Sequence, residues 1–393
     1  MIIVNRTIAI TSALWLSLFG CFDAHGQGNP YRRLLTIPVV VNGVAGTFLV
    51  DTGASGTILD SAFADRLGLK PSGGVSVERA YSTEQSVTVD VAQVAIGPKL
   101  WSDAPLAVLN LGTLSRMAGV PIVGVLGADL LATTIVKLSY SSGTAQVVTE
   151  IEDGALPVTL TKARGRYFVP VRIGRSTLAL LLDSGTNMTA ISDSAWQKLP
   201  SASKGQDRVE GVLSSGSSLG SALACLPALA LGDETADQLA LRELPARVVL
   251  PSQSGSFADA EFDGIVGGDI LARWEVTLDL HHAFIYLKPD PAFRPNPYEF
   301  VTVGIQFFKA EDGAFSVAAV WKPSPAESAG VVAGDRILSV NGQASATYTL
   351  DAFAHQLHGA PGTHVALEVA RPAGPEILHM TTRQLVCESA GAH

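Results

Sequence analysis

Apolar and polar residues alternate over short stretches of this chain. Val365, Leu367 and Val369 follow the period-2 pattern of a strand with one buried face. Residues 79–91 place polar residues around alternating apolar ones, which predicts a hairpin. Helical spacing marks short segments, namely 60–67, 193–199 and the set Leu350, Phe353, Ala354 and Leu357. With 38 glycines and 21 prolines, the pattern predicts a turn-rich protein of many short strands.

Two apolar runs each end at an aspartate that is followed by a hydroxyl residue and a glycine. Residues 37–68 lie over residues 169–200 at an offset of 132 (169 − 37) without a gap, and Asp51 then meets Asp183. A lone Asp-[Ser/Thr]-Gly is expected by chance in roughly one in five chains of this length, so one copy alone carries little weight.

A second block repeats in the same order. Residues 123–132 match residues 263–272 at an offset of 140 (263 − 123), and the extra eight residues are what a loop insertion adds. Short helices follow the aspartates in both copies, with Asp60 and either Ser192 or Asp193 as N-caps. The sequence therefore encodes one structural unit twice.

The duplicated unit resembles the aspartic peptidases of the pepsin and retropepsin type over about residues 34–287. A lobe of that family carries an apolar-apolar-Asp-[Thr/Ser]-Gly motif and then an apolar-apolar-Gly motif, which residues 125–127 and 265–267 supply. The resemblance implies a mainly β fold of two pseudo-symmetric, retropepsin-like β-barrel lobes, at 27–160 and 161–288. A second domain, described below, follows them.

The resemblance also implies what the aspartates do. Asp51 and Asp183 would face each other across a cleft, where two carboxylates about 3 Å apart share one proton. The ionised member acts as general base on a water, and the protonated member polarises the scissile carbonyl. By resemblance, the neighbours hydrogen-bond across the axis or support the carboxylates. They are Thr52, Gly53, Ser55, Ser184, Gly185 and Asn187, the last a departure from the usual Ser or Thr.

Other polar residues near the motifs receive structural interpretations. Asp129 and Asp269 are expected to hydrogen-bond their turns. Residues 79–91 are expected to form a flap, with Tyr81 interpreted as a surface residue, and residues 213–221 form the equivalent loop of the second lobe.

The C-terminal region resembles a PDZ domain, a small α+β barrel, over residues 298–386. Four prolines within 287–297 predict a stiff linker at 289–297 and a separately folding module. Ser324, Pro325 and Glu327 predict a capped helix, and Asn341-Gly342 predicts a hairpin turn. The resemblance places a peptide-binding loop at Gly304, Ile305, Gln306 and Phe307, where Gln306 replaces a glycine and core packing is favoured for Phe307.

The net charge and the N-terminal segment indicate which partners and which cellular location to expect. The net charge of −9 argues against nucleic acid and anionic membranes as partners. Residues 7–20 are uncharged and apolar, which predicts a signal peptide over 1–26 and a periplasmic or extracellular protein. The alternative is a lipobox with Cys21 acylated as a lipid anchor, and simple secretion is favoured.

Cysteines and histidines add little. Cys225 and Cys387 could pair in an oxidising compartment, but a buried Cys225 without a bridge is favoured. His281 and His282 point to opposite faces of a strand, and no metal or cofactor is expected.

Two functions are consistent with these features. One is a secreted aspartic endopeptidase that cleaves peptides or unfolded proteins, with a PDZ domain that recruits or positions substrate. The alternative is a non-catalytic peptide-binding adaptor that retains the peptidase fold.

Overall fold

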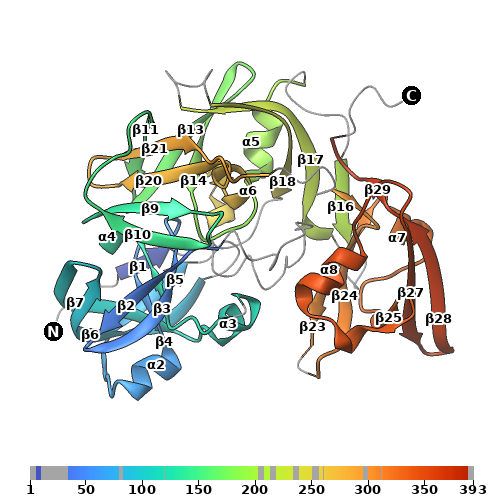
Figure 1. Cartoon of the computed structure of the whole chain (residues 1–393), viewed down its shortest axis with the longest axis horizontal. Coiled ribbons are helices and arrows are strands. Elements are labelled where there is room, and N and C mark those ends of the chain that lie inside the picture. The colour runs from blue at the N-terminus through green and yellow to red at the C-terminus, as the bar shows by residue number, and fades with distance from the viewer. Residues whose placement is uncertain are drawn as a thin grey trace.

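The structure is a computed structural model. It describes residues 6–9, 34–78, 83–118, 120–201, 208–212, 218–232, 239–249, 256–259, 261–294, 300–310 and 312–387. Most of the expected signal peptide, Cys21, Tyr81, part of the loop at 213–217 and the linker prolines at 295–297 lie outside these residues. Figure 1 shows two β lobes beside a smaller C-terminal domain.

The first lobe is a closed barrel. Its ring of six strands runs β2-β3-β8-β4-β7-β6, and β6 pairs with β2 to close it. The elements are β2 Thr36–Val41, β3 Val44–Val50, β4 Ile58–Asp60, α2 Ser61–Arg66, β5 Pro71–Glu78, β6 Thr83–Ile96, β7 Lys99–Leu109, α3 Gly112–Ala118, β8 Gly124–Leu126 and α4 Ala128–Leu131. A further strand, β1 Arg6–Ala9, pairs in parallel with β5 and belongs to the expected targeting segment.

The second lobe repeats this ring. Its order is β13-β14-β19-β15-β18-β17, closed by pairing of β13 with β17. The expected duplication and mainly β fold are therefore confirmed at the level of strand order. The elements are β12 Thr161–Ala163, β13 Arg166–Ile173, β14 Ser176–Leu182, β15 Ala190–Ser192, α5 Asp193–Lys198, β16 Arg208–Val212, β17 Ser218–Leu231, β18 Ala240–Val249, the 3-10 turn η2 Ser256–Ala258, β19 Gly264–Val266 and α6 Gly268–Leu271.

The two short helices after the aspartate loops begin where the sequence predicted. The Asp60 side chain accepts a hydrogen bond from the Phe63 amide at 3.2 Å, and Ser192 caps α5 through the Ala195 amide at 3.2 Å. Each helix turns an aromatic side chain, Phe63 or Trp196, into the core.

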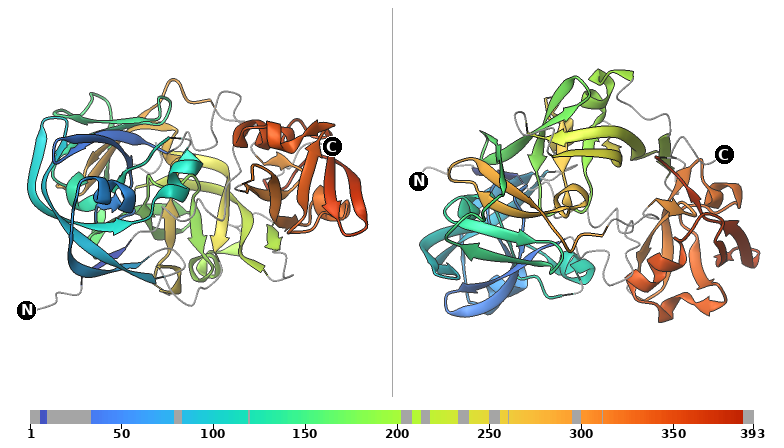
Figure 2. Two further views of the ribbon diagram at one scale, coloured as in Figure 1. Left: turned by 90° about the horizontal axis from the view of Figure 1, so that it is seen from below. Right: turned by 45° about the horizontal axis from the view of Figure 1, so that its top comes forward.

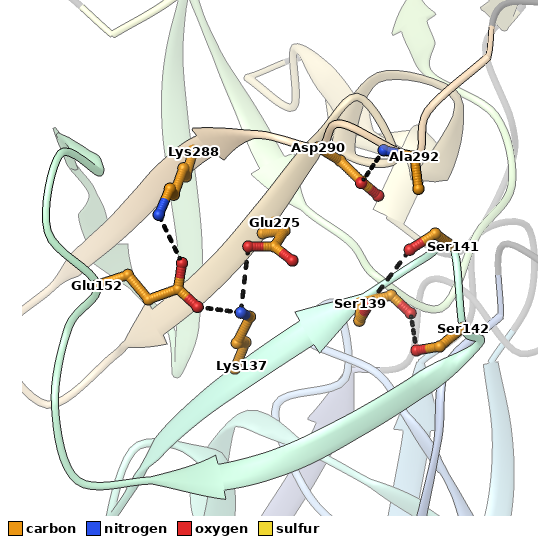
Figure 3. Close-up of polar contacts among 9 residues, drawn as sticks. All are labelled: Lys137, Ser139, Ser141, Ser142, Glu152, Glu275, Lys288, Asp290 and Ala292. Carbon is orange, nitrogen blue, oxygen red and sulfur yellow. Dashed lines mark hydrogen bonds and ion pairs between the residues drawn. The ribbon is translucent and has the colours of Figure 1, made fainter.

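A shared sheet joins the lobes. Strand β20 of the second lobe pairs with β9 of the first, so one sheet runs through β10-β9-β20-β21-β11. Figure 3 shows the polar contacts on this sheet: Lys137 pairs with Glu152 and, at 3.1 Å, with Glu275, while Lys288 lies 3.1 Å from Glu152. The strands are β9 Ile135–Ser139, β10 Thr144–Val148, β11 Leu156–Thr159, β20 Trp274–Asp279 and β21 Phe284–Pro289.

The C-terminal domain has its own buried core. Phe315 stacks on Phe353 at 4.0 Å between ring centroids, and Val365, Leu367 and Val369 are all buried. Its elements are β22 Val301–Thr302, β23 Ile305–Lys309, β24 Phe315–Lys322, α7 Pro325–Ser328, β25 Arg336–Val340, β26 Gln343–Ala344, the 3-10 turn η3 Ser345–Thr347, α8 Leu350–Gln356, β27 His364–Arg371, β28 Gly374–Thr381 and β29 Arg383–Gln384.

Two turn predictions in this domain are confirmed. Ser324 caps α7 by accepting from the Glu327 amide at 3.1 Å. Asn341 and Gly342 have φ values of 51° and 80°, as the two-residue hairpin turn requires.

The C-terminal domain is attached to the second lobe by more than the linker. Strand β24 pairs with β16, so the sheet of the second lobe continues into the domain. A disulfide joins Cys225 on β17 to Cys387, and the expectation of no bridge is therefore wrong. Cys225 is buried, as predicted, but the fold brings the tail back to it across 162 residues of sequence. The views of Figure 2 also place the domain against the second lobe.

Among the described residues, no helix is long and apolar enough to cross a membrane.

Candidate active site

Equivalent loops of the two barrels carry the two aspartates. Asp51 follows β3, and its amide donates to the Leu126 carbonyl of the parallel strand β8 at 3.0 Å. Asp183 follows β14, and its amide donates to the Val266 carbonyl of β19 at 3.1 Å. The buried apolar runs therefore end at the same place in each lobe.

The two carboxyl groups meet at the junction of the lobes. Both aspartates are fully buried, and a hydrogen bond joins their side chains. Asp51 Oδ1 also accepts from the amides of Gly53 and Ala54, each at 2.9 Å. Asp183 Oδ1 accepts from the Gly185 amide at 3.0 Å. The chain thus brings a pair of carboxyl groups together and surrounds them with backbone donors.

A reciprocal set of hydrogen bonds locks the two loops together. The Thr52 hydroxyl donates to the Leu182 carbonyl at 2.7 Å and accepts from the Ser184 amide at 2.9 Å. The Ser184 hydroxyl donates to the Val50 carbonyl at 2.8 Å and accepts from the Thr52 amide at 3.1 Å. Each hydroxyl therefore satisfies two buried backbone groups of the opposite lobe.

Burial controls the protonation of this pair. Loss of solvation raises the pKa of Asp51 to about 7, and the hydrogen bonds from Ala54, Gly53 and Asp183 offset only part of that effect. The site therefore retains a carboxylic acid to nearly neutral pH beside a second carboxyl group. That combination can supply a general acid and a general base together.

Two further aspartates support the loops from behind. Asp129 accepts from the Thr57 hydroxyl at 2.7 Å and from the Thr57 amide at 3.0 Å. Asp269 makes the same two contacts with Thr189, at 2.7 and 2.9 Å. Both carboxylates therefore hydrogen-bond residues of the aspartate loops, as the sequence analysis predicted.

The remaining residues from the sequence divide into two groups. Ser55 and Asn187 lie half-buried on the two aspartate loops. Gly304, Ile305, Gln306 and Phe307 lie apart from them, at the start of β23 in the C-terminal domain. Ile305 and Phe307 are buried, and the Phe307 ring lies 4.7 Å from that of Phe353, so core packing occupies these side chains. Gln306 is 1% exposed, and none of the residues that the structure describes forms a hydrogen bond with its side-chain amide.

A buried arginine beside the site was not predicted. Arg166, 6% exposed, donates to the Ser256 hydroxyl at 3.0 Å, and Ser256 donates to Glu78 at 2.9 Å. Glu78 is the last residue of β5 and pairs with Thr83, the first residue of β6, so the chain of contacts links this end of the β5–β6 hairpin to the second lobe. Burial lowers the pKa of Arg166, but a guanidinium stays charged at any physiological pH. The repeat places Leu34 opposite Arg166 (166 − 132), so the duplication gave no signal for this residue.

Within the described residues, no group of three or more His, Cys, Asp or Glu side chains is arranged to hold a metal ion.

Two family models match parts of the chain. An aspartyl protease model matches residues 37–130, and a PDZ domain model matches residues 316–371. No curated protein matches the sequence.

Matches among solved structures include the following two proteins. An aspartic proteinase from Irpex lacteus is 16% identical with a TM-score of 0.40, and the match covers 66% of this chain and 96% of that one. The photosystem II D1 C-terminal processing protease is 25% identical with a TM-score of 0.20, over 21% of this chain and 23% of that one. This chain thus spans under a quarter of the second protein's length. The two family matches therefore place an aspartyl-protease-like region at residues 37–130 and a PDZ domain at residues 316–371.

Proposed function

We propose that this protein is an aspartic endopeptidase in which Asp51 and Asp183 activate a water molecule for attack on a peptide bond. The observation that carries the proposal is the buried, hydrogen-bonded pair of carboxyl groups at the junction of two equivalent loops. Such a pair can divide the roles of base and acid, which a single buried carboxyl group cannot do.

In the proposed reaction, the pair begins with one proton. The ionised carboxylate takes a proton from the attacking water, and the protonated carboxyl group donates a hydrogen bond to the carbonyl oxygen of the scissile bond. A proton then passes to the departing amine, and the roles reverse. The proton belongs to the pair, because the two groups titrate together. Thr52 and Ser184 position the carboxyl groups by fixing the backbone on each side.

The proposed substrates are peptides or unfolded proteins, and the PDZ domain has a suitable edge for a peptide ligand. Among the described strands, β23 pairs with β24 alone, so an extended peptide can add along its other edge. Capture of a C-terminal carboxylate by the loop at Gly304 has less support, because Gln306 replaces a glycine and is itself buried.

The proposed location is outside the cytoplasm. The uncharged apolar segment at 7–20 supports export, and the Cys225–Cys387 disulfide fits an oxidising compartment. A lipid anchor at Cys21 stays the alternative to free secretion.

The decisive experiment replaces one carboxyl group at a time. Asp51→Asn and Asp183→Asn should each abolish cleavage of a fluorogenic peptide between pH 3 and 8 while the circular dichroism spectrum stays unchanged. The expected loss is at least about 10³-fold, and it should be no greater in the double variant because the pair acts as a unit. A pepstatin-type inhibitor should block the wild-type protein.

Asp129→Asn is the matched control, because this aspartate hydrogen-bonds Thr57 of the loop and does not belong to the pair. Its main effect should be on stability. If wild-type protein cleaves nothing while the PDZ domain binds peptides, the non-catalytic adaptor replaces this proposal.

A further inference from the structure

The hairpin β16–β17 of the second lobe corresponds to the hairpin β5–β6 of the first. The flap expected at residues 79–91 is therefore displaced, because residues 83–91 belong to the single strand β6, which pairs with β5. In the two rings, β6 and β17 occupy equivalent places, and β5 and β16 pair with them from outside. In the second lobe, the outer edge of this hairpin is paired with the PDZ domain. Glu210 lies opposite Lys322, Gly211 opposite Trp321 and Val212 opposite Val320.

An apolar cluster covers this junction. Val209 and Leu223 come from the hairpin, and Trp321 from the strand of the PDZ domain that it joins. The segments that flank the domain contribute the rest of the cluster, which consists of Phe300, Leu385 and Val386. All six side chains are at most 7% exposed, so the junction has the burial of a core rather than that of a loose domain contact.

The same cluster reaches the active-site loop. Met188, five residues after Asp183, packs against it. The carbonyl carbon of Met188 lies 2.6 Å from the position that a Cβ on Gly267 would occupy. The backbone of the Asp183 loop is therefore in close contact with the turn that precedes α6. A shift of the cluster would therefore be transmitted to the loop that carries Asp183.

The disulfide closes this arrangement covalently. Cys225 lies on β17 two residues after Leu223, and Cys387 directly follows Val386. The bond therefore fixes the segment that ends at Cys387 against β17. Leu385 and Val386 of this segment belong to the same apolar cluster as Leu223 of β17. Without the bond, Leu385 and Val386 are held by packing and by the hydrogen bond that the Leu385 amide donates to the Phe300 carbonyl at 3.0 Å.

We propose that the PDZ domain is a built-in clamp on the β16–β17 hairpin and that the Cys225–Cys387 disulfide is its redox-sensitive latch. The closed latch organises the hairpin and the Asp183 loop for catalysis. This regulation rests on the proposed peptidase function.

The opening reaction is a thiol–disulfide exchange. A dithiol reductant transfers two electrons and two protons to the Cys225–Cys387 bond, which gives two cysteine thiols, and the dithiol becomes a cyclic disulfide. Reoxidation reverses the step.

The test compares the oxidised and dithiol-reduced forms of the full chain. Cys21→Ser is introduced in every sample so that one cysteine pair is under study. Reduction should increase amide hydrogen exchange in β16, β17 and β24, whereas β2 and β3 should be unaffected. In the same samples, kcat/KM for a short peptide should fall by about tenfold, the effect of a modest loss of active-site organisation.

Two variants separate the latch from a general effect of reductant. Cys225→Ser/Cys387→Ser should behave like the reduced form and should not respond to the dithiol. Val209→Asp, which buries a carboxylate in the cluster, should loosen the hairpin even when the disulfide is intact. Val40→Asp makes the same change at an exposed position of β2, where the valine is 38% exposed, and should leave exchange and activity near the wild-type values.

The outcomes distinguish the two proposals. Unchanged exchange in β16, β17 and β24 on reduction overturns the clamp, and so does equal or higher kcat/KM after reduction. If the protein cleaves no peptide in either state, the peptidase function fails, while the exchange measurement still decides whether the latch exists.

Discussion

A carboxyl group that is removed from water keeps its proton to higher pH, and Asp51 is such a group. Its pKa is raised to about 7 in the folded protein from its ordinary value of 3.8. The folded state therefore binds a proton that the unfolded state releases between these two pH values. The contribution of Asp51 to the free energy of unfolding is accordingly largest below pH 4, falls as the pH rises to about 7, and is constant above that.

This sign gives a pH prediction. The stability advantage of the wild-type protein over Asp51→Asn should shrink as the pH rises from 4.5 to 7.5, and it should shrink by at least about 1 kcal/mol. Urea unfolding at the two pH values measures it. Parallel stability curves for the two proteins would contradict the raised pKa. Peptide cleavage by wild-type protein should likewise fall above about pH 7, as the pair loses its shared proton.

The crossed hydroxyl contacts lead to a second prediction at the scale of residues. Thr52→Val keeps the shape of the side chain but leaves the Leu182 carbonyl and the Ser184 amide without their partner. We expect a loss of about 2–4 kcal/mol in the free energy of unfolding, since each unsatisfied buried group costs about 1–3 kcal/mol. Thr159→Val, on an exposed strand position, is the control. A loss equal to that of the control would show that these bonds do not hold the lobes.

Functional residues that occur in both copies of the repeat could be predicted from the sequence. A residue that occurs in one copy alone could not. Asp51 and Asp183 stand out because one motif occurs twice, and the structure brings them together. Arg166 has Leu34 as its counterpart, so no repeat draws attention to it. Its role depends on Glu78 and Ser256, which are distant in sequence and meet only after folding.

Among the secondary-structure elements, glycines allow the strand-to-helix turns to contact the aspartate loops. A Cβ on Gly267 would lie 2.6–2.9 Å from backbone atoms of Met188, and one on Gly127 would lie 2.5 Å from the backbone of Gly56. Backbone atoms cannot move aside as a flexible side chain can. The two lobes therefore use the same close approach to place their loops.

Gly267→Ala should displace the Met188 segment. We expect a loss of about 1–3 kcal/mol in stability, the usual cost of overpacking, and a lower kcat because Asp183 lies on the same loop. Thermal unfolding and peptide kinetics measure the two effects. Gly74→Ala is the control, because an added Cβ there meets no atom within 4 Å. Wild-type kcat in Gly267→Ala would argue against this coupling.

Local signals predicted the elements well where a single residue fixes the geometry. The caps at Asp60, Ser192 and Ser324 and the Asn341-Gly342 turn all lie where the sequence indicated. Strand partners are a different matter, because pairing between β16 and β24 depends on register between segments about 110 residues apart, and neither segment carries a local mark of it. The disulfide was missed for the same reason.

At the scale of the whole molecule, continuous sheets replace the expected string of modules. One sheet joins the two lobes through β9 and β20, and another joins the second lobe to the PDZ domain through β16 and β24. The prolines of the linker predicted a separately folding module, whose removal would not unfold the lobes. The strand pairing and the disulfide lead us to expect that its removal disturbs the second lobe.

A chain that ends at Arg294 tests this expectation, with Cys225→Ser included so that no free thiol complicates the result. The truncation keeps both aspartates but uncovers Val209, Leu223 and Met188. Each fully buried apolar side chain contributes about 1.5–3 kcal/mol, so the melting temperature should fall by about 5–10 °C. We expect kcat/KM for a short peptide to fall as well, because the Asp183 loop loses its support.

The full-length Cys225→Ser/Cys387→Ser protein is the control for the disulfide alone. Its melting temperature and kcat/KM should lie between those of the truncated and wild-type proteins. If the truncated protein matches wild type in both melting temperature and short-peptide cleavage, the PDZ domain is a separate recruiting module, as the linker composition first indicated.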